Sequence, residues 1–274
     1  MQVKKLLLLA LAVSAGIASY AQQKDKKTAK QERIEARMQL EEENDPPFKK
    51  QHIFGIKLNS DGYGISYESG KYKTVRKTRL LQFELNEKFN PKEEKVTSSQ
   101  DAFGNVSQVK FGKANNFFQF KVGYGQQYLI GGKANKNGVA VSAIYVGGLS
   151  LGILKPYYID VQDQNTGEQL RYKFTDSIPT NSNYAIIGAS GATVGWSEVK
   201  FKPGVHAKGA LRFDYGRFNE TVTALEAGLN MEYYTSEILQ MTYATQKGPN
   251  PPFVSKQNKF FINAYITIEF GRRK

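Results

Sequence analysis

The last part of the chain alternates apolar and polar residues over an unusual length. In the segment KFFINAYITIEFGRRK, every second residue from Phe260 to Phe270 is apolar, and most of the residues between them are polar. Strict alternation is typical of a β-strand with one apolar face. Strands of globular proteins usually have about 5–6 residues, whereas a strand that crosses a bilayer needs about 9–11. The alternation over 260–270 therefore predicts a membrane-spanning strand.

Seven further segments alternate in the same way before the last one. Their apolar-face residues fall within 54–58, 63–67, 81–85, 118–124, 139–154, 205–215 and 225–233. The fifth is nearly all apolar and could form a helix, but its Val and Ile residues and the Gly147-Gly148 pair favour a strand. A soluble sandwich would alternate too. The strand lengths, the even count and the aromatic residues near strand ends favour an all-β fold, an eight-stranded antiparallel up-and-down transmembrane β-barrel.

The first 21 residues have the composition of a secretory signal peptide. Lys4 and Lys5 precede an apolar run over 6–17, and Ser19-Tyr20-Ala21 is a small-x-small cleavage motif. The apolar run is shorter than a spanning helix, which argues against an uncleaved anchor. We therefore expect residues 1–21 to be removed on export.

The mature chain is expected to begin with a periplasmic leader and continue as one barrel. Residues 22–51 are highly charged and include Pro46-Pro47, which predicts a short helical or disordered leader, and the outer-membrane barrel follows over 52–274. With the N-terminus in the periplasm, the connections expected at the cell surface are 88–115, 155–203 and 235–258. Long outer and short inner connections are typical of outer-membrane barrels, although the first outer turn at Ser60-Asp61-Gly62 is short.

Charged residues recur on the faces of the strands that oppose the apolar ones. They predict a polar network in the lumen, formed by Lys57, Glu84, Lys121, His206, Lys208, Arg212, Asp214, Glu226, Glu232 and Glu269. Eight strands leave a bore that side chains fill, so a general diffusion pore is not expected. Charges buried there must pair, because an isolated buried ion is very costly.

The chain has a formal net charge of +13, and part of the excess collects at the expected inner connections and the C-terminus. A basic periplasmic rim is predicted from Lys71, Lys73, Arg76, Lys77, Arg79, Arg272, Arg273 and Lys274. Such a rim would attract anionic lipid headgroups or dock an acidic periplasmic partner. Nucleic acid is not expected as a partner of an exported barrel.

The connection after Lys155 offers a candidate contact surface outside the barrel. It contains Tyr157, Tyr158 and Trp196, the single tryptophan of the chain. These residues could meet a partner, or the connection could fold over the mouth of the barrel.

The sequence gives little support for catalysis. With no cysteine, thiolate nucleophiles and thiolate metal sites are excluded. His206 could form a triad with Ser142 or Ser150 and Glu226, while His52 is expected before the first strand. The two histidines show no metal-ligand spacing. The glycine-rich stretches lack the complete phosphate-loop pattern. We expect no enzyme activity, no metal and no cofactor.

Several segments together resemble the small outer-membrane β-barrel proteins of Bacteroidota. They are the leader cleaved before AQQ, FGIKLNSDGYGISYESG, GGLSLGILKPYY, FKPGVHAKGALRFDYG and the ending FFINAYITIEFGRRK. The resemblance implies a barrel in the outer membrane and a group that includes accessory barrels of type 9 secretion and barrel-assembly machines. It implies no catalytic residues.

The expected function is that of a non-enzymatic accessory or scaffold subunit of an envelope protein-assembly or secretion machine. Its expected partners are outer-membrane lipid and a larger outer-membrane barrel or periplasmic proteins. The alternatives are a surface lipid-modifying hydrolase or acyltransferase centred on His206, and a small-solute channel.

Overall fold

The computed structural model describes residues 48–100, 106–133, 138–173, 184–216, 220–244 and 253–274. The expected signal peptide, and the expected leader as far as residue 47, lie outside these described residues. Within the described part of the chain, no helix is long and apolar enough to cross a membrane.

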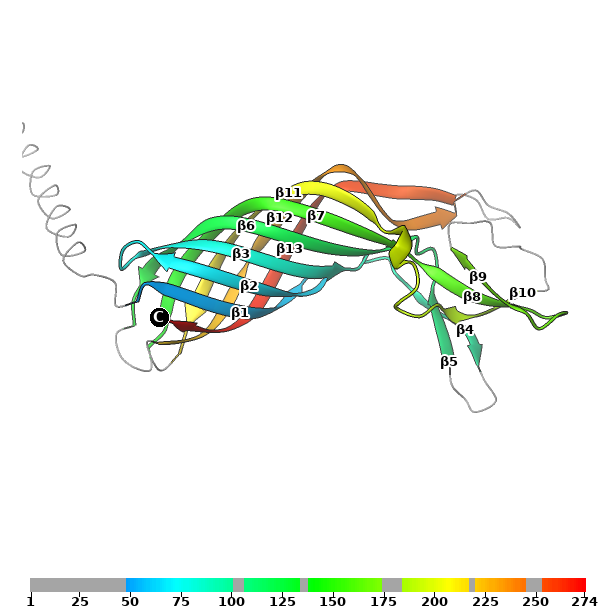
Figure 1. The fold of residues 1–274 in the computed structure, drawn as a ribbon, viewed down its shortest axis with the longest axis horizontal. Helices are drawn as coiled ribbons and strands as arrows, with labels where there is room; N and C mark the ends of the chain where they lie inside the picture. Colours follow the sequence, from blue (N-terminus) through cyan, green and yellow to red (C-terminus); the bar gives the residue numbers. More distant parts are fainter. Residues whose placement is uncertain (1–47, 101–105, 134–137, 174–183, 217–219, 245–252) are drawn as a thin grey trace, which may run out of the picture. The chain divides into compact units, whose positions relative to one another are not determined.

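Eight antiparallel strands form a closed barrel (Figure 1). They are β1 (Lys50–Asn59), β2 (Gly62–Tyr72), β3 (Lys77–Lys88), β6 (Asn115–Gly131), β7 (Ala140–Pro156), β11 (Lys200–Asp214), β12 (Thr221–Ala244) and β13 (Phe253–Arg273). Each strand pairs with the barrel strands before and after it in the chain, and β1 pairs with β13 to close the barrel. The backbone N–H groups of Lys49 and Lys50 both donate to the carbonyl of Lys274, at 2.7 and 2.8 Å. The up-and-down barrel expected from the sequence is confirmed.

Burial alternates along the barrel strands because successive side chains of a strand point to opposite faces. In β1, Phe54 and Ile56 are 65% and 61% exposed, whereas Lys57 beside them is only 1% exposed. The closing strand β13 shows the same contrast between exposed Ile266 and buried Thr267. The outer wall of the barrel is therefore apolar and its interior polar.

Three expected boundaries differ from the structure. Strand β6 continues to Gly131, seven residues beyond the apolar-face segment 118–124 expected from the sequence. Strands β12 and β13 keep pairing past Tyr233, with register shifts between Tyr233 and Ile238 and between Leu239 and Met241, so the expected connection 235–258 is mostly strand. His52 lies within β1 rather than before the barrel, and its Nδ1 is 2.9 Å from the hydroxyl of Tyr67.

The two longest connections were expected as loops but contain β-sheet. The paired strands are β4 (Lys95–Gln100) with β5 (Val106–Lys110), and β8 (Tyr158–Asp163) between β9 (Gln169–Lys173) and β10 (Tyr184–Ala189). We call these five strands the accessory sheets. Val109 of β5 packs with Tyr157, Ile159 and Val161 in one buried cluster. The two connections therefore fold against each other.

Candidate functional site

Arg212 of β11 is buried in the lumen and joins three carboxylates. Its Nη2 donates to Glu68 at 2.7 Å, to Glu226 at 2.8 Å and to Glu269 at 2.9 Å. All four residues are almost completely buried. The planar guanidinium suits this arrangement because its five N–H groups point outward in a fixed fork. One cation thus ties β2, β11, β12 and β13 together across the bore.

Lys208, four positions before Arg212 on the same face of β11, extends the network towards β3. Its Nζ donates to Glu226 at 3.1 Å and to Glu84 at 3.2 Å. Glu84 also accepts from Lys57 at 2.9 and 3.0 Å, and Lys121 approaches it at 3.8 Å. Glu84 is therefore shared by three lysines from three strands.

Glu232 of β12 forms the third cluster of the lumen. It accepts from Lys121 at 2.5 Å and pairs with Lys88 at 3.1 Å. Lys88 also pairs with Asp61 at 2.9 Å, in the β1–β2 turn. Because Lys121 also lies near Glu84, the three clusters form one continuous chain of alternating charges through the barrel.

We call this chain of ion pairs the lumen network. Its described members are five cations and five carboxylates, namely Lys57, Lys88, Lys121, Lys208, Arg212, Glu68, Glu84, Glu226, Glu232 and Glu269. The balance of charge and the close contacts offset much of the cost of removing these ions from water. Their side chains fill the bore, as expected for eight strands.

Most residues that the sequence placed in the lumen do meet there, but the sequence analysis missed Glu68 and Lys88. Glu68 follows the outward residue Tyr67 on β2 and therefore points inward. Lys88 continues the inward series of Gln82, Glu84 and Asn86 on β3. The same period-two pattern would have identified both, had it been extended to the ends of those strands.

Asp214 and Arg273 pair with each other at the end of the barrel where β1 begins and β13 ends. Arg273 also donates to the hydroxyl of Tyr72 at 2.9 Å, and Lys133 lies 3.3 Å from Asp214. The sequence placed Asp214 in the shared network and Arg273 in a basic rim. Instead, the two form an inward-facing cluster of their own.

The other members of the predicted basic rim are spread over two locations. Lys71, Lys77, Arg79, Arg272 and Lys274 are exposed residues at this end of strands β2, β3 and β13, while Lys73 and Arg76 lie in the β2–β3 turn. Arg272 pairs with Glu220 at 3.6 Å. The side chains of the strand residues alternate with buried ones and so point away from the lumen.

His206 lies beside Ser150 in the lumen, with its Nδ1 3.1 Å from the serine hydroxyl. The ring fills space above Gly123, where an added Cβ would lie 3.0 Å from Nε2. Both partners are less than 10% exposed. Glu226, the expected third member of a triad, bonds instead to Lys208, Arg212 and the hydroxyl of Tyr265. The pair therefore belongs to the packed interior of the barrel.

The predicted contact surface around Tyr157 differs from expectation. Tyr157 is only 8% exposed, and its hydroxyl accepts from the backbone of Lys110 at 3.0 Å, so it is a core residue of the accessory sheets and the expected surface role is wrong. Tyr158 is half-buried and donates to Glu198. Trp196 is 51% exposed, and its ring stacks on Phe118 with 5.8 Å between centroids.

A buried ion cluster supports the connection between β3 and β6. Glu93 accepts from Lys110 at 2.6 Å and from Lys113 at 2.9 Å. Burial lowers the pKa of Lys113 to about 8, despite the opposing effect of Glu93. Burial alone would raise the pKa of Glu93, but hydrogen bonds from the two lysines hold it below its usual value. In the described residues, no group of three or more His, Asp or Glu side chains could hold a metal ion.

Comparisons with known proteins found only distant structural similarity, to other barrels. No protein-family model matches it, and no curated protein matches its sequence. Two matching solved structures are Neisserial surface protein A, at 9% identity and a TM-score of 0.36, and Ail, the attachment invasion locus protein of Yersinia pestis, in complex with the heparin analogue sucrose octasulfate, at 10% and 0.37. Each match covers 82% of this chain, with 95% and 98% of the other chain. Similarity this low does not bear on function. The assignment of the barrel fold rests on the pairing of this chain's own strands.

Proposed function

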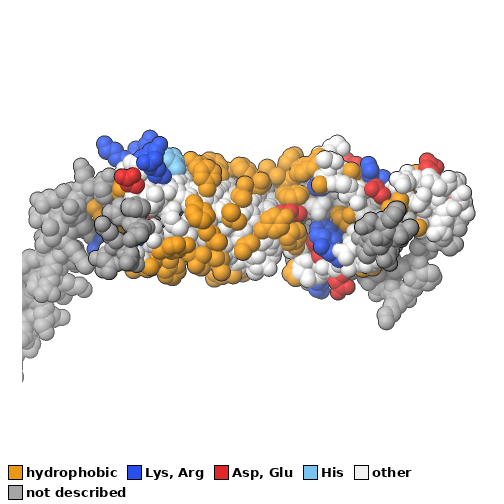
Figure 2. Space-filling model, turned by 90° about the horizontal axis from the view of Figure 1, so that it is seen from below, with side chains coloured by type: hydrophobic (Ala, Val, Ile, Leu, Met, Phe, Trp, Pro, Cys, Tyr) orange, Lys and Arg blue, Asp and Glu red, His pale blue; other side chains and the backbone are white. Residues whose placement is uncertain are grey.

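We propose that the chain is an outer-membrane β-barrel that acts as a non-enzymatic scaffold. One observation carries the proposal, namely an apolar outer wall around a lumen filled by paired charges. Leu149, Phe54 and Ile262 are 70%, 65% and 57% exposed, and Figure 2 shows hydrophobic side chains across the middle of the barrel. In water a patch of this extent would promote association. In a bilayer it is the surface that lipid chains contact.

The lengths of the connections support an outer-membrane orientation. The β2–β3 connection runs only from Tyr72 to Lys77, at the end where β1 begins and β13 stops. The accessory sheets arise from connections at the opposite ends of the strands. Short periplasmic turns and long external connections are typical of outer-membrane β-barrels. The proposal also includes a signal peptide over 1–21 and a periplasmic leader from residue 22; the leader ends before Lys50, where β1 begins, and not at residue 51 as expected from the sequence.

The filled lumen favours a role for the surfaces beyond the membrane. Described side chains of the lumen network occupy the bore, which opposes a small-solute channel. The accessory sheets are packed through Tyr157 and Val109 into a fixed unit that could present a surface to a partner. We therefore propose an accessory subunit of an envelope assembly or secretion machine, of the Bacteroidota kind that the sequence resembles. Its proposed partners are a larger outer-membrane barrel or periplasmic proteins.

A mild-detergent purification from outer membranes tests this role. The tag belongs after Gln23, because a tag after Lys274 would disturb the closing strand. The proposal expects a larger barrel or periplasmic proteins at stoichiometric amounts. Recovery of the barrel alone at native abundance would count against it.

Two charge-reversal variants would locate the contact. The variant Lys73→Glu/Arg76→Glu/Lys77→Glu alters the turn at the periplasmic end. The matched control Lys95→Glu/Lys200→Glu/Lys259→Glu alters exposed lysines of the opposite end. Loss of periplasmic partners in the first variant alone would identify the basic rim as the docking surface. Loss in the second variant alone would move the contact to the external end.

A further inference from the structure

The outer wall formed by β13, β1, β2 and β3 is layered at its periplasmic end. Strand pairing aligns the outward residues of these four strands in rows. From the end inward, the rows are Lys274, Lys50, Lys71 and Arg79; then Arg272, His52, Ser69 and Leu81; then Phe270, Phe54, Tyr67 and Phe83; then Ile268, Ile56, Ile65 and Leu85. Rows two residues apart along a strand are separated by about 7 Å. Cations, then aromatic rings, then aliphatic chains thus follow one another within a short distance.

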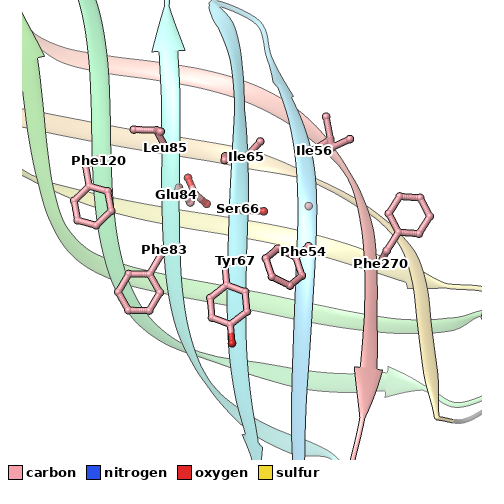
Figure 3. A pocket seen from close by; sticks show the side chains of 11 residues that line it. Phe54, Ile56, Ile65, Ser66, Tyr67, Phe83, Glu84, Leu85, Phe120 and Phe270 are labelled. Atoms are coloured by element: carbon pink, nitrogen blue, oxygen red, sulfur yellow. The ribbon is translucent and has the colours of Figure 1, made fainter.

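The aromatic and aliphatic rows line a concavity of about 410 Å³ (Figure 3). The rings of Phe54, Tyr67 and Phe83 and the side chains of Ile65 and Leu85 surround it on the outer face of the wall. Its volume falls within the range of small-molecule sites. The lining is almost entirely apolar, so the matching ligand group is a hydrocarbon chain.

The cations next to this concavity face outward. Lys50, Lys71, Arg79, Arg272 and Lys274 are all exposed, and Arg272 pairs with Glu220 at 3.6 Å. Figure 2 shows Lys and Arg side chains gathered beside a histidine at one edge of the hydrophobic band. The ring of His52 stacks on Tyr67 with 6.2 Å between centroids, at the boundary between the two zones.

The rest of the described wall lacks this combination. At the same end of β6, β7 and β11, the described outward residues include Tyr128, Ile130, Val141 and Tyr215, with no Lys or Arg among them. Among the described strand residues at this end, the outward cations lie on the side of the barrel that carries the concavity. Their position beside the concavity points to a single ligand that has an anionic head and an apolar chain.

We infer that this face binds one anionic phospholipid of the periplasmic leaflet. Its phosphate would lie among Lys50, Lys71, Arg79 and Arg272, and one acyl chain would occupy the concavity. Lys and Arg are the usual phosphate-binding side chains. The inference rests on the proposed placement of the barrel in the outer membrane.

Native mass spectrometry of the mature barrel in detergent tests the site. Dioleoyl phosphatidylglycerol is added as the anionic probe and dioleoyl phosphatidylcholine as the zwitterionic one, with glycerol phosphate as a headgroup without chains. The wild type should retain one phosphatidylglycerol. With about 1 kcal/mol per cation, Lys50→Ala/Lys71→Ala/Arg79→Ala should weaken that binding about a hundredfold.

Two further variants separate the two halves of the site. Ile65→Trp should fill the concavity and reduce retention while keeping every cation, and it tests the site even if the triple variant does not fold. The matched control Lys95→Ala/Lys200→Ala/Lys259→Ala should bind as the wild type does. Equal retention of the two phospholipids, equal loss in the control, or binding of glycerol phosphate as tight as that of the phospholipid would overturn the inference.

The same preparation separates this inference from the proposed function. Insertion into phosphatidylcholine vesicles, followed by circular dichroism and protease protection, reports the membrane barrel alone. Insertion without selective retention of phosphatidylglycerol would refute only the lipid site. Failure to insert into any bilayer would refute the membrane placement.

Discussion

Replacing Arg212 by Met should destabilise the barrel by about 3–5 kcal/mol. The substitution keeps a long apolar side chain in the bore but removes the cation that Glu68, Glu226 and Glu269 share. Removing one partner of a buried ion pair usually costs about this much, because the remaining charge is left uncompensated. Here three carboxylates lose their common partner, so we expect the upper part of that range.

The assay is equilibrium unfolding by urea in phosphatidylcholine vesicles, followed by fluorescence and circular dichroism. Arg171→Met is the matched control, since Arg171 pairs with Asp160 at 2.9 Å but is 52% exposed. Exposed pairs contribute about 0–1 kcal/mol. The two variants therefore compare the same substitution in a buried and an exposed ion pair.

A rescue variant makes the cause explicit. Adding Glu68→Gln and Glu269→Gln to Arg212→Met neutralises the two carboxylates left without a cation, while Glu226 keeps its contact with Lys208, and most of the lost stability should return. If Arg212→Met costs no more than Arg171→Met, the lumen network does not stabilise the barrel as described. If the glutamines fail to restore stability, the loss comes from packing rather than charge.

Three further outcomes follow from the structure. Reconstituted barrels should show no discrete conductance in planar bilayers, because side chains fill the lumen; stable single-channel steps would contradict this. His206→Ala should leave the lipid A composition unchanged by mass spectrometry, because His206 and Ser150 are buried; an altered acyl pattern would support the hydrolase alternative. Acid should loosen the β3–β6 connection by hydrogen exchange. The pKa of Glu93 is lower in the fold than in the unfolded chain, so its contribution is present above about pH 4.3 and lost as the pH falls through the lowered value. Glu93→Gln should weaken the connection at neutral pH, and its protection should then change less with acid than that of the wild type.

Period-two alternation was sufficient to place the barrel strands and their inward faces. It placed Lys57, Glu84 and Lys208 on the lumen side, because each outward position of a strand faces lipid and each inward position faces the polar lumen. By the same rule Arg272 points outward and Arg273 inward. The sequence analysis treated both as part of a basic tail.

The accessory sheets could not be predicted in the same way. Strand β8 has only six residues, and its inward positions Ile159 and Val161 are too few to establish a period. Tyr157 is buried because Val109, from another connection, packs beside it. Contacts between distant segments decide burial there, and no local pattern records them.

The lumen network also has a consequence for how the strands find their partners. Lipid does not distinguish a strand from the same strand moved by two residues, since the outer wall would still present Ile, Leu or Phe. Inside, such a displacement would separate Lys57 from Glu84 and Arg212 from Glu226. The buried charges would then lack partners in a narrow bore, at a cost of several kcal/mol. We therefore expect barrels with misaligned strands to be unstable, because their lumen contains unpaired charges. Contact with the surrounding lipid does not provide this discrimination.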